Sequence, residues 1–327
     1  MMMKQALIAT IYGELHVHSL NVFDIGTNKE YIDYGRMSHE MASALSTRLA
    51  SLERYLSEND IAVRIGLAIP GHVVDMIADH DEDLLQRLAT FISTNNVELL
   101  SMPYYAGSMH VLSGEELKAQ VEHHNHVIRE HLGASPSVFF TAEDHLSAEH
   151  VSALSNAGLS SCIDSRALEA TTSTKPTLIA LDISAFEDPS SIPSSLDTDS
   201  LEGVDVISSS FSLDTVSSVE SSTVLSPMQE HIISELKGLY PHVSSTGDED
   251  LLSHWRYLAH HKAVFHTDAA GELKKSQYDH YMDMMNIFND IAHKIRSVEL
   301  SKNGVFLTEP EVADSPSHLL QTMSCER

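Results

Sequence analysis

Two acids and a histidine, Glu143, Asp144 and His145, directly follow an apolar run in the middle of the chain. The run at 137–140 has the length and composition of a buried strand, and residues 147–158 then follow a helical pattern. In α/β enzymes the residues that carry the chemistry lie at the C-terminal ends of parallel strands. Acids can also simply open a helix, where the positive end of the helix dipole favours them. The pattern therefore predicts a site at 143–145 and leaves helix capping open as the alternative.

Two histidines with a metal-ligand spacing, His16 and His18, follow the first apolar segment. Alternate residues of a strand project to the same side, so both rings could reach one divalent metal ion. A complete metal site needs further ligands at later strand ends. The conceivable ones are His72, His110, His145, His266 and Asp268. None of these belongs to a recognisable metal motif, and metal-dependent hydrolysis therefore stays an alternative.

Apolar periodicity divides the chain into alternating strands and helices. The expected strands are 5–12, 62–69, 96–102, 137–140, 160–164, 177–182, 204–213 and a short one at 263–267. The expected helices are 38–57, 72–78, 82–94, 115–132, 147–158, 228–239, 250–260 and 276–298. Gly133, after the helix at 115–132, is expected to adopt a left-handed C-cap. Short connections between strand and helix indicate parallel strands with right-handed crossovers, in a barrel or in an open doubly wound sheet.

Two segments depart from this pattern. Residues 188–226 are rich in Ser, Asp, Thr and Pro, and are expected to be a loop region or a degraded part of the fold. Residues 301–327 have no convincing periodicity and are expected to be a C-terminal tail.

The composition excludes several classes of function. Acidic residues outnumber basic ones by 47 to 20, and the formal net charge of −27 opposes binding to nucleic acid or to an anionic membrane. No stretch is long and apolar enough to cross a membrane, and the first residues resemble a strand more than a signal peptide. The two cysteines, Cys162 and Cys325, are far apart in sequence and suit reduced thiols. We therefore expect a cytoplasmic protein that binds a neutral substrate or a cationic partner.

Several islands of sequence, in the same order, resemble glycoside hydrolase family 57, the family of α-amylases and 4-α-glucanotransferases. They are Glu14-Leu15-His16-Val17-His18, the strand at 96–105 that ends in Pro103-Tyr104-Tyr105, the helix at 115–133, the stretch at 136–143, and the segments at 239–272 and 276–295. Together they cover most of residues 7–165 and 228–295.

The resemblance implies an α/β fold, an incomplete seven-stranded (β/α)7 TIM-like barrel with additional C-terminal helices. Residues 1–300 would form this single domain, with closing helices at 228–298. The implied substrate is an α-glucan or oligosaccharide, and the implied chemistry is retaining hydrolysis or transfer without a cofactor or metal. Such a reaction uses two carboxyl groups about 5–5.5 Å apart.

The same resemblance assigns roles to individual residues. Glu143 matches the family's nucleophile, and Asp214 is the only candidate in the right order for its acid/base. The residues expected to line the sugar site are His16, His18, Tyr104, Tyr105, His145 and Trp255.

The chain also departs from the family pattern. Val17 and His18 replace a Gln and a Pro, and Ala106 stands where the family has a His. Asp214 could equally cap a turn in its Ser-rich loop. A catalytically inactive homologue that binds a glucan or a protein partner therefore remains an alternative to an enzyme.

Overall fold

The computed structural model describes residues 5–11, 15–27, 29–58, 65–94, 97–141, 143, 146–164, 177–182, 187, 211–212, 224–265 and 276–302. Seven strands fall within these residues: β1 (Gln5–Thr10), β2 (Ile65–Ala68), β3 (Val97–Leu100), β4 (Val138–Phe140), β5 (Ser161–Ile163), β6 (Thr177–Asp182) and β7 (Phe211–Ser212). The chain is therefore a mixed α/β protein, as its alternating pattern predicts.

The strands follow one another in two hydrogen-bonded groups. The first has the order β3-β2-β1-β6 and is parallel throughout, and the second has the order β4-β5-β7. A parallel bridge between Ser101 and Phe139 joins β3 to β4, where the Ser101 N–H donates to the Val138 carbonyl over 2.8 Å. The C-terminal ends of β1 to β6 therefore lie at one edge.

Side chains of alternate strand residues divide between two apolar clusters, because successive residues point to opposite faces of a sheet. The larger cluster contains Leu7 and Phe139 and packs against the helices. The smaller one takes its members from neighbouring strands and the segments that follow them: Ile8, Ala68, Leu100, Met102, Ala106, Val138, Phe140 and Ile163. One face of the strands thus encloses a small apolar cluster of its own.

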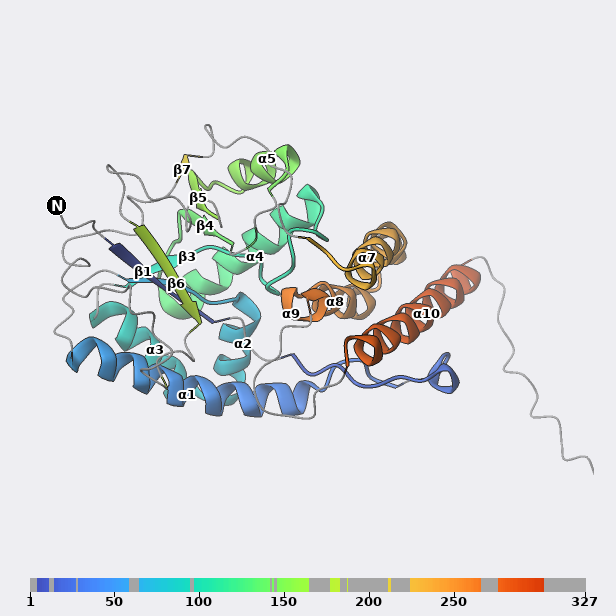
Figure 1. Cartoon of the computed structure of the whole chain (residues 1–327), viewed down its shortest axis with the longest axis horizontal. Coiled ribbons are helices and arrows are strands. Elements are labelled where there is room, and N and C mark those ends of the chain that lie inside the picture. The colour runs from blue at the N-terminus through green and yellow to red at the C-terminus, as the bar shows by residue number, and fades with distance from the viewer. Residues whose placement is uncertain are drawn as a thin grey trace, which may run out of the picture.

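Five helices flank the strands (Figure 1): α1 (Tyr34–Glu58), α2 (Gly71–His80), α3 (Glu82–Thr94), α4 (Gly114–Leu132) and α5 (Ala148–Asn156). In Figure 1, α1 and α3 lie on one side of β1, β2 and β3, and α5 lies beside β4 and β5. The α4 helix begins at Ser113, whose hydroxyl accepts from the Glu116 N–H, and ends at Gly133 with φ of 66°. The predicted left-handed C-cap is therefore confirmed.

A second group of helices lies beside the strand ends (Figure 1): α7 (Pro227–Thr246), α8 (Glu249–Leu258), α9 (His261–Phe265) and α10 (Gln277–Lys302). Helix α7 contacts the other three. A buried ion pair connects α8 with α4, because the Arg256 guanidinium contacts both carboxylate oxygens of Glu116, at 2.6 and 3.1 Å. This ion pair connects the C-terminal helices with the helices that flank the strands.

Helix α10 is anchored on the loop that contains the short 3-10 helix η1 (Val22–Asp24). The fully buried Asp290 accepts from the Tyr31 hydroxyl at 2.5 Å and from the Gly26 N–H at 2.6 Å. Lys294, one turn further along α10, lies 3.3 Å from the same carboxylate. These buried hydrogen bonds attach α10 to the η1 loop, although the two segments are far apart in sequence.

Two expectations from the sequence need correction. Residues 263–267 were expected to form a strand, but His261–Phe265 is helix α9, because the N–H groups of Ala263 and Val264 turn back to the His260 carbonyl. The seventh strand was expected to be parallel, and the described β7 pairs antiparallel with β5.

Apart from 187, 211–212 and 224–226, the Ser- and Asp-rich region and its borders lie outside the described residues, as do 303–327. Among the helices that the structure describes, none is long and apolar enough to span a membrane.

Candidate active site

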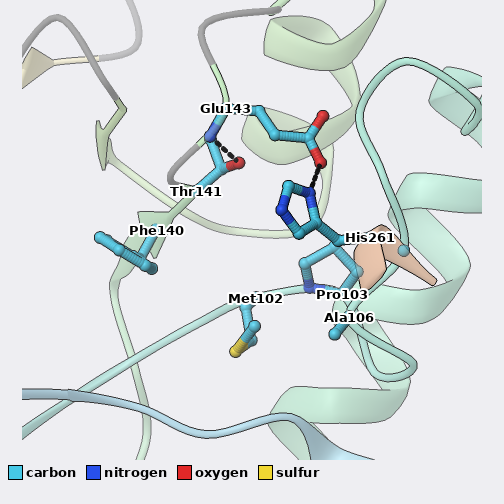
Figure 2. Close-up of a pocket in the computed structure, with 8 residues that line it drawn as sticks. Met102, Pro103, Ala106, Phe140, Thr141, Glu143 and His261 are labelled. Carbon is cyan, nitrogen blue, oxygen red and sulfur yellow. Dashed lines mark hydrogen bonds and ion pairs between the residues drawn. The ribbon is translucent and has the colours of Figure 1, made fainter. Parts of the chain in front are cut away.

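Glu143 lies just beyond the C-terminal end of β4, with its side chain directed into the protein (Figure 2). Its backbone N–H donates to the Thr141 hydroxyl over 3.1 Å, which fixes the chain as it leaves the strand. Only 8% of the Glu143 side chain is exposed. A nearly buried carboxylate needs hydrogen-bond donors, and the described residues supply three.

The first two donors come from the loop between β3 and α4. The Ser108 hydroxyl lies 3.1 Å from the Glu143 Oε2 atom, and the Met109 backbone N–H donates to the same oxygen over 2.9 Å. The His110 Nε2 atom is 4.0 Å from it. The loop thus holds one oxygen of the carboxylate.

The third donor comes from the C-terminal helices. The Nδ1 atom of His261, the first residue of α9, lies 2.8 Å from the Glu143 Oε1 atom (Figure 2). Since an ionised carboxylate only accepts hydrogen bonds, Nδ1 carries the hydrogen. Residues 118 positions apart in the sequence therefore meet at this carboxylate.

A small cavity lies beside the carboxylate. Among described residues it is lined by Met102, Pro103, Ala106, Gly107, Phe140, Thr141, Glu143 and His261. Its volume is about 20 Å³, close to the space that one water molecule needs. In this conformation the cavity accommodates water beside Glu143, and a sugar ring requires it to widen.

The predicted paired tyrosines lie near this cavity but are not among its lining residues. Tyr104 is buried and donates its hydroxyl to Asp75 over 2.6 Å, while its ring stacks on His123. Tyr105 is half-buried and stacks on His72 at a centroid distance of 6.1 Å. The two rings are held by protein partners, and Tyr105 has the greater exposure of the two.

Trp255 occupies the hydrophobic core. Its side chain is fully buried, and its indole N–H donates to the Leu236 carbonyl over 2.9 Å. A ring without exposed surface has no face to offer a sugar. This position corrects the expectation that Trp255 lines the sugar site.

The two N-terminal histidines lie in a different environment. The His16 Nε2 atom lies 2.7 Å from Glu40 on α1, and the His18 N–H donates to the Tyr31 carbonyl. Neither is among the described lining residues of the Glu143 cavity. Within the described part of the chain, no group of three or more His, Cys, Asp or Glu is arranged to hold a metal ion. Asp214, His145, His266 and Asp268 lie outside the described residues.

Sequence reasoning missed two side chains that contact Glu143, Ser108 and His261. Ser108 follows the predicted Tyr104-Tyr105 pair by three residues, so its closeness to a strand end was a usable signal. His261 offered no comparable signal, because its segment was interpreted as the approach to a strand.

The fold and the site define an α/β protein with an oriented carboxylate at the C-terminal end of a parallel strand. The model of the family "Glycosyl hydrolase family 57" matches residues 2–180, more than half of the 327 residues. The chain belongs to this family, and the resemblance found in the sequence is confirmed. Comparison with curated proteins finds no match.

Three solved structures are similar to this chain at low sequence identity. The 4-α-glucanotransferase of Thermococcus litoralis is 17% identical, with a TM-score of 0.37, over 51% of this chain and 23% of that chain. The GH57 branching enzyme of Thermococcus kodakaraensis, solved with glucose, is 11% identical, with a TM-score of 0.34, over 99% of this chain and 72% of that chain. A glycosyl hydrolase family 38 protein of Enterococcus faecalis is 11% identical, with a TM-score of 0.43, over 93% of this chain and 40% of that chain. The chain thus spans about a quarter of the glucanotransferase.

Proposed function

We propose that this protein acts on α-glucans by a retaining mechanism, in hydrolysis or transfer, with Glu143 as nucleophile. The observation that carries the proposal is the orientation of the Glu143 carboxylate at the end of β4. Membership of glycosyl hydrolase family 57 supports the reaction class.

The hydrogen bonds distinguish the two oxygens of Glu143. Among described residues, Oε2 accepts from Ser108 and Met109, and Oε1 accepts from His261. A carboxylate oxygen has two lone pairs, so Oε1 keeps one that can attack an anomeric carbon. The attack forms a glycosyl ester on Oε1 as the glycosidic bond breaks, and a second carboxyl group protonates the leaving oxygen. Water or another sugar hydroxyl then releases the glycosyl group.

The proposal also includes an acid/base and further sugar contacts, of which Asp214 and His145 lie outside the described residues. We propose Asp214 as the acid/base, and His16, His18, Tyr105 and His145 as sugar contacts. The strand order and the small inner apolar cluster support an incomplete (β/α)7 barrel. The contact between Glu143 and His261 supports a single domain over residues 1–300. We also propose a cytoplasmic location, because the sequence contains only two cysteines and they are far apart in sequence.

The test is turnover of maltoheptaose by the unmutated chain, by Glu143→Gln, and by Glu122→Gln as a matched control. Glu122 lies on α4 with a side chain 53% exposed, so its substitution is expected to leave turnover unchanged. Glu143→Gln is expected to lose at least about 10³-fold, because an amide is a poor nucleophile. A fluoroglycoside that accumulates the ester should add its glycosyl mass to the peptide containing Glu143. Full activity in Glu143→Gln would refute the proposed nucleophile.

A second candidate function is a catalytically inactive, glucan-binding homologue. The cavity of about 20 Å³ beside Glu143, which is too small for a sugar ring in this conformation, favours the absence of catalysis at this carboxylate. Maltoheptaose that binds to the unmutated chain without turnover or labelling would establish this alternative.

A further inference from the structure

A short backbone ladder connects the loop after β3 with the junction between α8 and α9. The Ser108 N–H donates to the Ala259 carbonyl, and the His261 N–H donates to the Ala106 carbonyl, each over 2.9 Å. Gly107 and His260 face each other between these bonds in an antiparallel bridge. Two segments about 150 residues apart thus form one unit directly beside Glu143.

Both segments of this ladder supply donors to Glu143. Ser108 and the adjoining Met109 N–H hold Oε2, and His261 holds Oε1. The neighbouring His260 packs instead against His72, with 6.0 Å between ring centroids. His260 and His261, although adjacent in sequence, therefore contact different partners.

The buried ion pair of Arg256 and Glu116 reaches the same unit. The Gln120 side-chain amide donates to Glu116 over 2.9 Å, and its oxygen accepts from the Tyr105 N–H at 3.3 Å. Tyr105 directly precedes the ladder. The α8 helix is therefore fixed on the loop from two sides, and His261 has little freedom to move relative to Glu143.

We propose that His261 is a positioning residue that holds Oε1 of Glu143 in the orientation for attack, an inference that rests on the proposed function. With Oε2 held by Ser108 and Met109, the His261 Nδ1–H sets the rotation of the carboxylate about its last bond. The loss of this donor leaves the carboxylate in place but free to rotate. Its effect therefore falls on the reaction step rather than on substrate binding.

The inference extends the site beyond the segment that matches the family. The match ends at residue 180, and His261 lies in the C-terminal helices. The reacting carboxylate thus depends on a residue from outside the matched segment.

The test compares His261→Leu, which removes the donor, with His261→Asn, whose amide N–H lies close to the position of Nδ1. Turnover of an aryl α-maltotrioside is measured over a range of concentrations, and thermal unfolding verifies that both variants are folded. We expect kcat to fall about 10- to 100-fold in His261→Leu with KM within about twofold, because misplaced reacting groups affect rate more than binding. His261→Asn should recover at least about tenfold of that loss.

The outcomes separate this inference from the proposed function. If Glu143→Gln abolishes turnover while His261→Leu keeps kcat within twofold, the positioning role is wrong and the nucleophile stands. A loss in His261→Leu that His261→Asn does not recover also overturns the positioning role, because it indicates a requirement for the ring and not for the donor. No turnover by the unmutated chain overturns both.

Discussion

The His261 backbone N–H donates to the Ala106 carbonyl over 2.9 Å, at a residue whose own backbone is left-handed, with φ of 52°. Ala106 is the one non-glycine residue of the described chain with positive φ, and it lines the cavity beside Glu143. A left-handed conformation costs a residue with a Cβ atom roughly 1–2 kcal/mol. The ladder that carries His261 is therefore formed at a strained position.

We expect Ala106→Gly to change the free energy of unfolding by less than about 0.5 kcal/mol. Relief of strain offsets the loss of a buried methyl group, worth about 0.8 kcal/mol, and the added chain entropy of glycine. The matched control is Ala153→Gly in helix α5, also nearly buried, where no strain is relieved and about 1–2 kcal/mol should be lost. Chemical denaturation measures both, and equal losses would contradict the strain at Ala106.

Arg256→Met is expected to reduce the free energy of unfolding by about 3 kcal/mol or more. It leaves the Glu116 carboxylate, 2% exposed, without its cation. Lys118→Met is the control, because it breaks an ion pair with Glu122 on α4, the helix of Glu116. The Lys118 and Glu122 side chains are 43% and 53% exposed, so the loss of their ion pair should cost less than about 1 kcal/mol. The double variant Glu116→Met/Arg256→Met should be more stable than Arg256→Met alone. A double variant that is less stable would mean that packing, and not the unpaired charge, dominates.

Tyr31→Phe is expected to destabilise the protein by about 1–3 kcal/mol. It removes a donor from Asp290, which is fully buried between α10 and the η1 loop. Tyr278→Phe is the control, because it removes a hydroxyl from an α10 tyrosine that is 60% exposed. It should change the free energy of unfolding by less than about 0.5 kcal/mol. Equal effects of the two substitutions would indicate that Asp290 does not depend on Tyr31.

Stability is expected to fall as the pH decreases from 6.5 towards 4, in part through His72. Burial lowers the pKa of His72 to about 4, and burial also lowers the pKa of His124. Because the unfolded state binds protons below about pH 6.5 and the folded state does not, each group stabilises the fold above this pH and loses its contribution below it. His72 alone should account for about 2 kcal/mol between pH 6.5 and pH 5.

Urea denaturation at pH 7 and pH 5 measures this dependence. His72→Asn keeps a side-chain donor for the Tyr104 carbonyl, which lies 2.9 Å from the His72 Nδ1 atom, and should give a smaller pH dependence. His126→Asn on α4, at a position 68% exposed, serves as the control and should keep the dependence of the unmutated chain. The same pH dependence in His72→Asn and the unmutated chain would exclude His72 as its source.

Much of the fold could be predicted because local signals dominate it. Helix α3 covers the predicted Glu82–Thr94, and β6 covers the predicted Thr177–Asp182. Trp255 also had a signal that was not used. It follows Leu251 by four residues and precedes Leu258 by three, a spacing that places all three on one buried helix face. His124 shares that spacing with Leu117 and Val121 on α4, and it is also buried.

The environment of Glu143 could be predicted only in part. A strand that ends in an acid indicated Glu143, but the pairing of Ala106 with His261 depends on how the C-terminal helices dock. That docking involves Glu116 and Arg256, 140 positions apart, and local sequence patterns carry no information on such a contact.

The distance in sequence between Glu143 and His261 also bears on folding order. In synthesis from the N-terminus, Glu143 is made 118 residues before His261, so its carboxylate lacks one of its donors until most of the described chain has been made. Contacts of such long range form slowly, because the loop-closure entropy precedes any gain from the contact. The hydrogen bond between the two residues should therefore be among the last contacts of the fold to form.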